Sequence, residues 1–186
     1  MKKVLLFIMI LLVTGCTVVR IDTSNIDNII GVVLSKENDL FNRIGKGYKY
    51  YIPRGVTYVD TAELNDTLYS SGNYYYLYID VISYFNKVDK EYKVNSDAYY
   101  SKLIDKNGKK GYIEINEQDG KYFIEFMYNY AKIESLVERD EISSVVLNAS
   151  YILSTIKFND DVIKIMLNSD FFTNKEEVYD IFTIKK

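Results

Sequence analysis

Apolar residues recur at helical spacing near both ends of the chain. Ser24 or Asn25 can cap a first helix, which is predicted to run through about Leu34. Its apolar stripe stands at i, i+3, i+4 and i+7: Ile26, Ile29, Ile30 and Val33. Asp140 is a candidate N-cap for a longer helix with its own stripe: Ile142, Val145, Val146, Ala149, Ile152, Leu153 and Ile156. The pattern therefore predicts two amphipathic helices that pack on an apolar surface.

Two shorter elements are predicted beyond residue 158. Asn159, with Asp160 and Asp161 behind it, is expected to open a helix that ends near Leu167. Residues 173–176 fit a capping box for a last short element.

The residues between the two predicted amphipathic helices have the pattern of β-strands. A strand over 48–52 ends at Pro53, and residues 56–59 can resume the extended form. A polar segment follows, with Glu63 to Asp66 and residues 70–72. A long strand is then predicted from Tyr74 to about Phe85, with an aliphatic face and a tyrosine-rich face.

Three further strands are predicted as a meander over 98–104, 111–116 and 121–133. Asn107-Gly108 lies in the first connection and Asp119-Gly120 in the second, and both pairs accept positive φ at low cost. The predicted fold class is therefore α+β. An antiparallel meander packs with an N-terminal helix and a long C-terminal amphipathic helix.

Composition removes several chemistries from consideration. The 186 residues include no His, one Cys and no Trp, with 23 Lys and Arg against 26 Asp and Glu. A chain without His has no His-based catalytic triad and no His-ligated metal, and one Cys makes neither an internal disulfide nor a thiolate cluster. The acidic balance argues against nucleic-acid binding. We expect no cofactor, no metal site and one domain of ordinary size.

The first 16 residues carry the most specific signal. Lys2 and Lys3 precede an unbroken apolar run over 4–13, which as a helix spans only about 15 Å, half of a hydrocarbon core. This run is typical of a signal peptide rather than a transmembrane anchor. The stretch that follows, Val13-Thr14-Gly15-Cys16, resembles the lipobox of bacterial lipoproteins.

The lipobox resemblance implies a specific mature form. Signal peptidase would recognise Val13, Thr14 and Gly15 and cut before Cys16, whose sulfur would carry diacylglycerol. Residues 1–15 would then be the signal peptide, 16–24 a lipidated tether and 25–186 the domain, held on the extracytoplasmic face of the cell membrane. The alternatives are a secreted protein, or a buried first strand with an unrelated Cys.

Loss of Lys2 and Lys3 would leave 21 basic residues against the 26 acidic ones. On net charge alone, the mature domain is expected to stand off an anionic membrane.

A second resemblance concerns the domain itself. The segments Gly47 to Pro53 and Ile152 to Phe158, with the meander between them, resemble the PsbP-like α/β/α sandwich. That family often has a Trp after the Pro-Gly turn, which this chain lacks, and the chain runs on well past Phe158. The resemblance implies a binding or assembly accessory and transfers no catalytic residue.

Carboxylates and tyrosines are the remaining candidates for a site. The pairs Asp160-Asp161 and Glu176-Glu177 are best read as helix-capping charge, because adjacent helical residues diverge. Asp80 is placed within the predicted strand among tyrosines, where burial would raise its pKa. The 19 Tyr could form a stacking surface for a glycan or peptide, or simply pack a sheet.

These observations favour a membrane-anchored, non-enzymatic binding or assembly module for an envelope partner. The alternative is a carrier of a lipid or small apolar molecule, in a cleft between the sheet and the helix at 142–156. A carboxylate-based envelope hydrolase is the third hypothesis.

Overall fold

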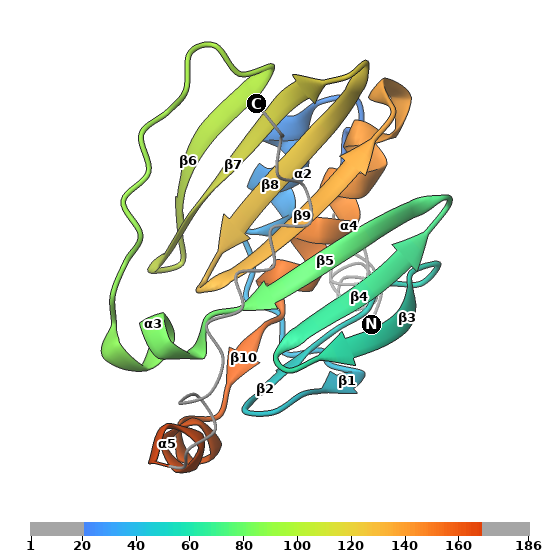
Figure 1. Ribbon diagram of the computed structural model, residues 1–186. Helices are drawn as coiled ribbons and strands as arrows, with labels where there is room; N and C mark the ends of the chain where they lie inside the picture. The colour runs from blue at the N-terminus through green and yellow to red at the C-terminus, as the bar shows by residue number, and fades with distance from the viewer. Residues whose placement is uncertain (1–20, 169–186) are drawn as a thin grey trace, which may run out of the picture.

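A computed structural model of the protein describes residues 21–168 (Figure 1). The predicted acylation site at Cys16, its neighbours Val13, Thr14 and Gly15, and the predicted capping box at 173–176 lie outside these residues.

The described residues form an α+β fold with two antiparallel sheets, which confirms the predicted fold class. The large sheet has the strand order β3-β4-β5-β9-β8-β7-β6. Its strands are β3 (Thr57–Ala62), β4 (Asn65–Ser70), β5 (Asn73–Ile79), β6 (Tyr100–Lys106), β7 (Lys109–Gln118), β8 (Lys121–Tyr128) and β9 (Ala131–Val137). A small sheet of order β1-β2-β10 consists of β1 (Arg43–Ile44), β2 (Tyr48–Tyr50) and β10 (Lys157–Phe158).

Four α-helices accompany the sheets in residues 21–168: α2 (Ile26–Val33), α3 (Val81–Asn86), α4 (Ile142–Ser154) and α5 (Asp160–Asn168). The predictions of α2 and α4 are confirmed, and Asn25 caps α2 by accepting a hydrogen bond from the Asn28 amide at 3.1 Å. None of these helices is long and apolar enough to cross a membrane.

The core lies between one face of the large sheet and the pair α2 and α4. Figure 1 shows both helices behind the sheet, and α4 packs on α2, β8 and β9. Apolar residues that alternate along the strands meet the helical stripe, and these side chains have no exposed surface: Ile113, Ile115, Ile124, Phe126 and Ile133 from the sheet, Ile29 from α2, and Val145, Val146, Ala149 and Ile152 from α4. Burying each large member contributes about 1.5–3 kcal/mol.

The prediction of Asp140 as the N-cap of the long helix is wrong. The chain begins to turn at Arg139, so Asp140 lies inside a 3₁₀ turn over Arg139–Glu141 that leads into α4. Glu138 is the last extended residue, with φ −74° and ψ 159°, and no side chain caps α4 itself. An N-cap needs an extended backbone, which Asp140 does not have.

The predicted strand from Tyr74 to Phe85 is too long. β5 ends at Ile79, and Asp80 then accepts hydrogen bonds from the amide and the hydroxyl of Ser83, both at 2.8 Å, to cap α3. Asp80 is therefore a helix cap and not a residue within a strand. The sequence signal for this cap is an Asp three residues before a Ser, at the end of an apolar alternation.

The predicted strand over 121–133 is in fact two strands. Asn129 and Tyr130 have φ of 53° and 60°, and this two-residue turn reverses the chain between β8 and β9. A turn with two positive φ values usually contains glycine. Because this one has none, its sequence reads as continuous strand.

The polar segment that follows Ala62 is also a strand. β4 pairs with β3 and β5, and its alternate residues Asp66, Leu68 and Ser70 are buried. The register of β3 against β4 shifts between Tyr58 and Asp60, which is a β-bulge in an edge strand.

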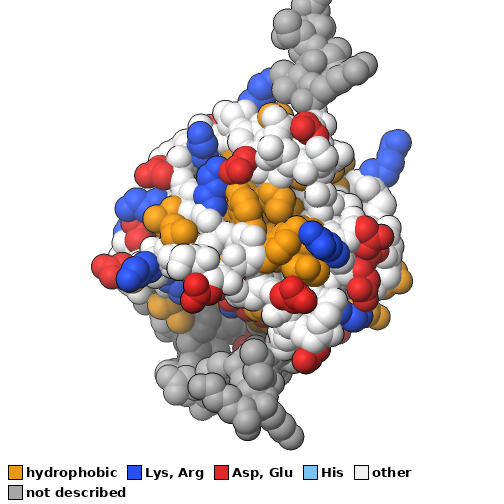
Figure 2. Space-filling model, turned by 90° about the horizontal axis from the view of Figure 1, so that it is seen from above, with side chains coloured by type: hydrophobic (Ala, Val, Ile, Leu, Met, Phe, Trp, Pro, Cys, Tyr) orange, Lys and Arg blue, Asp and Glu red, His pale blue; other side chains and the backbone are white. Residues whose placement is uncertain are grey.

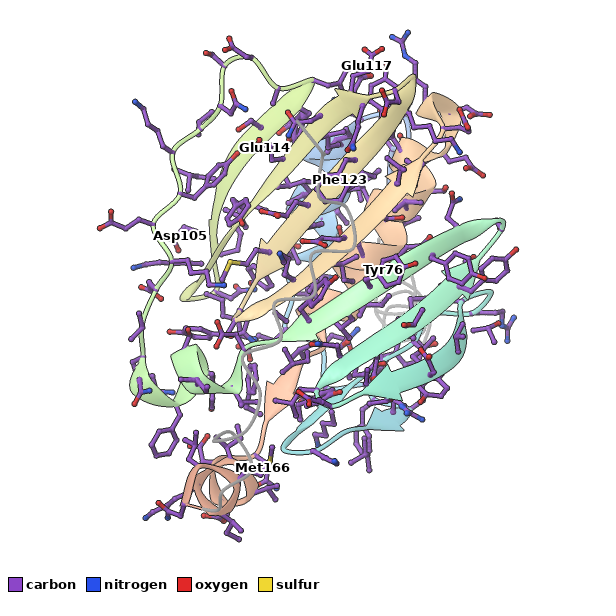
Figure 3. All side chains as sticks on the ribbon, viewed as in Figure 1. Tyr76, Asp105, Glu114, Glu117, Phe123 and Met166 are labelled. Atoms are coloured by element: carbon purple, nitrogen blue, oxygen red, sulfur yellow. The ribbon has the colours of Figure 1, made fainter. Side chains whose placement is uncertain are left out.

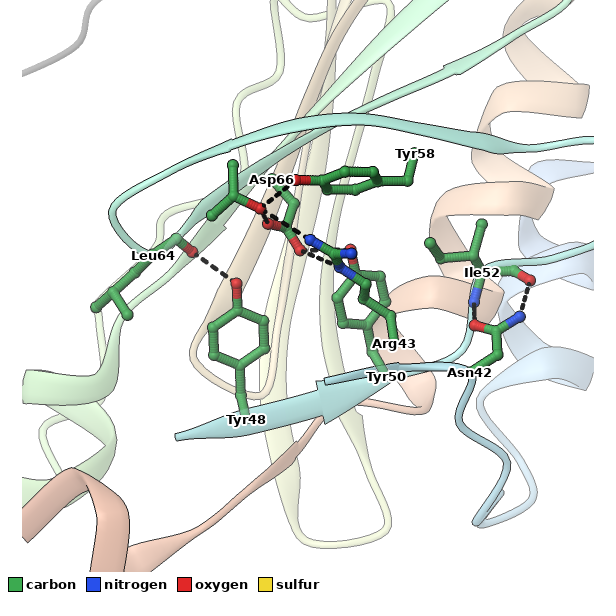
Figure 4. A network of polar contacts seen from close by, with 9 residues as sticks. Asn42, Arg43, Tyr48, Tyr50, Ile52, Tyr58, Leu64 and Asp66 are labelled. Carbon is green, nitrogen blue, oxygen red and sulfur yellow. Dashed lines mark hydrogen bonds and ion pairs between the residues drawn. The ribbon is translucent and has the colours of Figure 1, made fainter. Parts of the chain in front are cut away.

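A buried carboxylate joins the two sheets (Figure 4). Asp66 of β4 is 2% exposed and accepts a hydrogen bond from Tyr50 of β2 at 2.6 Å and another from Thr61 of β3. Arg43 of β1 donates to the Thr61 hydroxyl at 3.1 Å, places Nε 3.9 Å from Asp66, and stacks on the ring of Tyr58. Burial and the bond to Asp66 raise the pKa of Tyr50 far above its ordinary range, so the phenol stays a donor.

Candidate functional site

The face of the large sheet that points away from α2 and α4 carries a continuous polar and aromatic surface, which we call the open face. Successive side chains of a strand point to opposite faces of the sheet. The residues that alternate with the buried core residues therefore all lie on the open face. Cross-strand register aligns Tyr76 with Glu134, Glu134 with Glu125, and Glu125 with Glu114. Figure 3 shows Tyr76, Glu114 and Phe123 on this side of the sheet.

Tyrosines occupy the β4–β5 half of the open face. Tyr69 and Tyr74 are 38% and 48% exposed, with ring centroids 5.1 Å apart. Tyr74 and Tyr76 follow at 6.3 Å with nearly parallel rings. The Lys132 ammonium lies 5.1 Å from the ring of Tyr78, so the tyrosines adjoin the charged half of the face. The predicted tyrosine-rich face of β5 is thus part of a wider surface.

A lysine between two glutamates forms the centre of the open face. Lys132 contacts Glu125 at 3.6 Å and forms a closer ion pair with Glu134, and Tyr112 donates to Glu125 from the other side. Burial alone would lower the pKa of Lys132, but the bond to Glu134 and the charge of Glu125 raise it. Lys132 is therefore cationic at every physiological pH. Burial and the bond to Glu125 also raise the pKa of Tyr112 above its ordinary range.

The third glutamate of the row is held by a loop. Glu114 accepts hydrogen bonds from the amides of Asn116 at 2.9 Å and Asn95 at 3.1 Å, and from the Tyr92 hydroxyl. The Tyr92 ring stacks on Tyr112 at 3.9 Å. Burial alone would raise the pKa of Glu114, but the hydrogen bonds from Asn116, Tyr92 and Asn95 outweigh it and lower the pKa. Glu114 therefore stays ionised to a lower pH than an ordinary glutamate.

The glutamates of the row are held in place by their neighbours. Each glutamate of the row already accepts a hydrogen bond or ion pair from a neighbouring side chain. Within residues 21–168, no group of three or more His, Cys, Asp or Glu residues could hold a metal ion.

The acidic pair predicted at Asp160-Asp161 lies in the first turn of α5, as its capping interpretation expected. Asn159 accepts a hydrogen bond from the Val162 amide at 3.2 Å, and Asp160 accepts one from Tyr84 at 2.7 Å.

Sequence reasoning missed the glutamate row and Lys132. The sequence contains part of the signal for this row, since Glu114 and Glu125 occupy polar positions in strands where polar and apolar residues alternate. The alignment with Glu134 depends on the turn at Asn129 and Tyr130, which the sequence hides.

The PsbP-like resemblance stays a prediction. Comparison of the chain with known proteins gives no match to a family model, to a curated protein or to a solved structure.

Proposed function

We propose that this protein is a bacterial surface lipoprotein, anchored through Cys16, whose open face binds another protein of the cell envelope. Support for the anchor is the order of parts at the N-terminus: Lys2 and Lys3, a short apolar run, and then Val13-Thr14-Gly15-Cys16. Two or more acyl chains would hold the chain at the membrane without a spanning helix.

The single observation that carries the binding role is the exposure of tyrosines on the open face. Tyr74 leaves nearly half of its surface in contact with solvent, although Tyr75 and Leu77, on the other side of the same strand, are buried. Tyrosine gives a large contact area at a low entropy cost and is enriched in protein interfaces. The paired charges of Glu125, Lys132 and Glu134 add fixed polar contacts beside the rings.

The position of this surface favours a protein partner over an enclosed apolar ligand. The space between the sheet and α4, where a carrier would need a cleft, is filled by residues such as Ile133, Val146 and Ile152, which have no exposed surface. The open face extends over six adjacent strands, from β4 to β6 in the order of the sheet, which is a shape suited to another folded surface.

Replacing Cys16 by alanine tests the anchor. The native protein is expected to begin at residue 16 and to carry a lipid mass on its sulfur, and Cys16→Ala is expected to lose all incorporated lipid. Intact mass of membrane-extracted protein measures both. An intact Met1 with a free thiol would contradict the anchor.

A photoreactive phenylalanine analogue at position 74 tests the binding face. Tyr99 is the matched control, because it is 49% exposed but packs beside Tyr122 and Arg139 at the end of the sheet. We expect one covalent adduct of defined mass from position 74 and none from 99.

Once that adduct identifies the partner, Tyr74→Ala is expected to weaken its binding about tenfold or more. The same change should alter the free energy of unfolding by about 0.5 kcal/mol at most. Equal adducts from positions 74 and 99, or none from 74, would refute this use of the face.

A further inference from the structure

A groove of about 750 Å³ lies between the small sheet and α5. Apolar side chains form much of it, and several leave large surfaces in water: Phe41 is 47% exposed and Ile44 is 70% exposed. Ile165 of α5, also 70% exposed, extends the apolar surface beyond the groove. Figure 1 shows β1, β2, β10, α3 and α5 together at the lower end of the molecule.

Helix α3 continues this apolar surface. It packs against α5, and Tyr84 stacks on Phe158 of β10 at 3.9 Å. Ile82, Phe85 and Val88, on and just after α3, are 45%, 38% and 55% exposed. Exposed apolar side chains thus gather over both helices of this end, although isolated ones are ordinary on any surface.

Lysines surround the same apolar residues. Lys46, Lys49 and Lys157 line the groove, with Asp160 as its one carboxylate. A second hollow of about 300 Å³ is lined by four lysines, at positions 87, 90, 109 and 110, and one carboxylate, Asp89. Tyr84 joins the two hollows, because its ring also meets Tyr130, which lines the second one, at 5.7 Å.

This concentration of positive charge departs from the chain as a whole. The sequence has more acidic than basic residues, yet the two hollows together are lined by seven lysines and two aspartates. Three of these lysines are paired, Lys110 with Asp89, Lys157 with Asp39 and Lys90 with Asp80. Lys49 and Lys87 instead lie over the rings of Phe41 and Tyr84. The opposite end, seen in Figure 2, mixes charges of both signs around a central hydrophobic group.

The chain enters the described domain on the side of α2 and α4, beside a segment that leads to this end. Ile21 shares a hollow with Lys36 and Asn38, and residues 39 and 40 lead from there to Phe41. Cys16 is five residues before Ile21, a distance of at most about 18 Å when extended. An acyl chain on Cys16 would therefore hold the bilayer within a short reach of the lysines and exposed apolar residues.

We propose that this lysine-rich end, formed by β1, β2, β10, α3 and α5, docks on the surface of an anionic lipid bilayer. The lysines face lipid phosphates, and Phe41 and Ile44 enter the interface between headgroups and acyl chains. The inference rests on the proposed anchor. Net charge alone predicts that the domain stands off an anionic membrane, whereas this proposal predicts that one end of it docks there. The reason is that the distribution of charge over the surface, and not its sum, decides which end the membrane attracts.

A single-site fluorescent probe tests the docking. Acylation uses the sulfur of Cys16, so a cysteine introduced by Ile44→Cys is the only free thiol of the lipidated chain. The control is Leu103→Cys on β6, because Leu103 is 54% exposed and lies on the open face. Each labelled protein is reconstituted into vesicles of phosphatidylcholine, with or without phosphatidylglycerol, that contain a nitroxide-bearing lipid as quencher.

We expect quenching at position 44 in vesicles with phosphatidylglycerol, with little at position 103 and less at 44 in phosphatidylcholine alone. Lys46→Gln and Lys49→Gln should each lower the docking equilibrium about fivefold, and Lys121→Gln at the β7–β8 turn should not change it. Added salt should weaken the docking by screening.

Several results would overturn the proposal. Equal quenching at positions 44 and 103 in acylated, vesicle-bound protein would contradict the docking. Quenching that does not depend on phosphatidylglycerol or on the lysines would also contradict it. In both cases the proposed anchor would still stand. If the probe at position 44 is already shielded from water before vesicles are added, the surface is covered by another part of the protein. Shielding that depends on protein concentration would assign the surface to a second copy, and shielding that does not would assign it to residues 169–186 of the same chain. An unacylated chain that stays in the supernatant would refute anchor and docking together.

Discussion

Replacing Asp66 by alanine is expected to lower the free energy of unfolding by about 3 kcal/mol. The carboxylate accepts hydrogen bonds from Tyr50 and Thr61, and Arg43 lies beside it. Without it, the buried Tyr50 hydroxyl loses its acceptor and the guanidinium loses its counter-charge. The effect should lie at the low end for a buried ion pair, because the Arg43 side chain is 31% exposed. Urea unfolding of the protein measures it.

Asp60→Ala is the matched control for this change. Asp60 belongs to the neighbouring strand β3 and is exposed, so its loss should alter stability by about 0.5 kcal/mol at most. Asp66→Asn should fall between the two, because the amide keeps one acceptor oxygen. If Asp66→Ala were as stable as the native chain, the network would contribute nothing net to the junction of the sheets.

Gly111→Ala is expected to destabilise the fold by about 3 kcal/mol. A Cβ at Gly111 would stand 2.1 Å from the Met127 carbonyl oxygen and 2.8 Å from the Tyr128 Cα, both backbone atoms of β8. β8 is paired on both sides, with β7 and β9, so it has little room to retreat. Calorimetric or urea unfolding measures the loss.

A second glycine gives a control of opposite sign. Gly31 lies within α2, and a Cβ there meets nothing within 4 Å. Gly31→Ala should therefore stabilise the protein by about 1 kcal/mol, because alanine favours the helix. Equal effects of the two changes would show that the close approach of β7 to β8 is not rigid.

The parts of the fold that the sequence could predict are those with long, regular apolar spacing. The stripe from Ile142 to Leu153 identifies α4, and the Asn-Gly and Asp-Gly pairs identify the β6–β7 and β7–β8 hairpins. The errors occur where the local signal is weak. Asn129-Tyr130 turns without glycine, and Asp80 ends an apolar alternation that could equally have continued as strand.

The polar contacts were less predictable than the elements, because they join residues far apart in the sequence. Asp66 and Tyr50 are 16 residues apart, and their contact depends on how the small sheet meets the large one. The predicted tyrosine-rich face lies on the open face of the sheet. Its extension across Glu125 and Lys132 follows from strand order, which alternation alone does not specify.

The bulge between Tyr58 and Asp60 has a consequence for solubility. β3 is an outer strand, and a regular outer strand offers unpaired amides and carbonyls to any other chain. A shift of one residue breaks that repeat and twists the strand away from flat pairing. The irregularity therefore hinders another molecule from pairing with the β3 edge and extending the sheet there, even where many copies are crowded together.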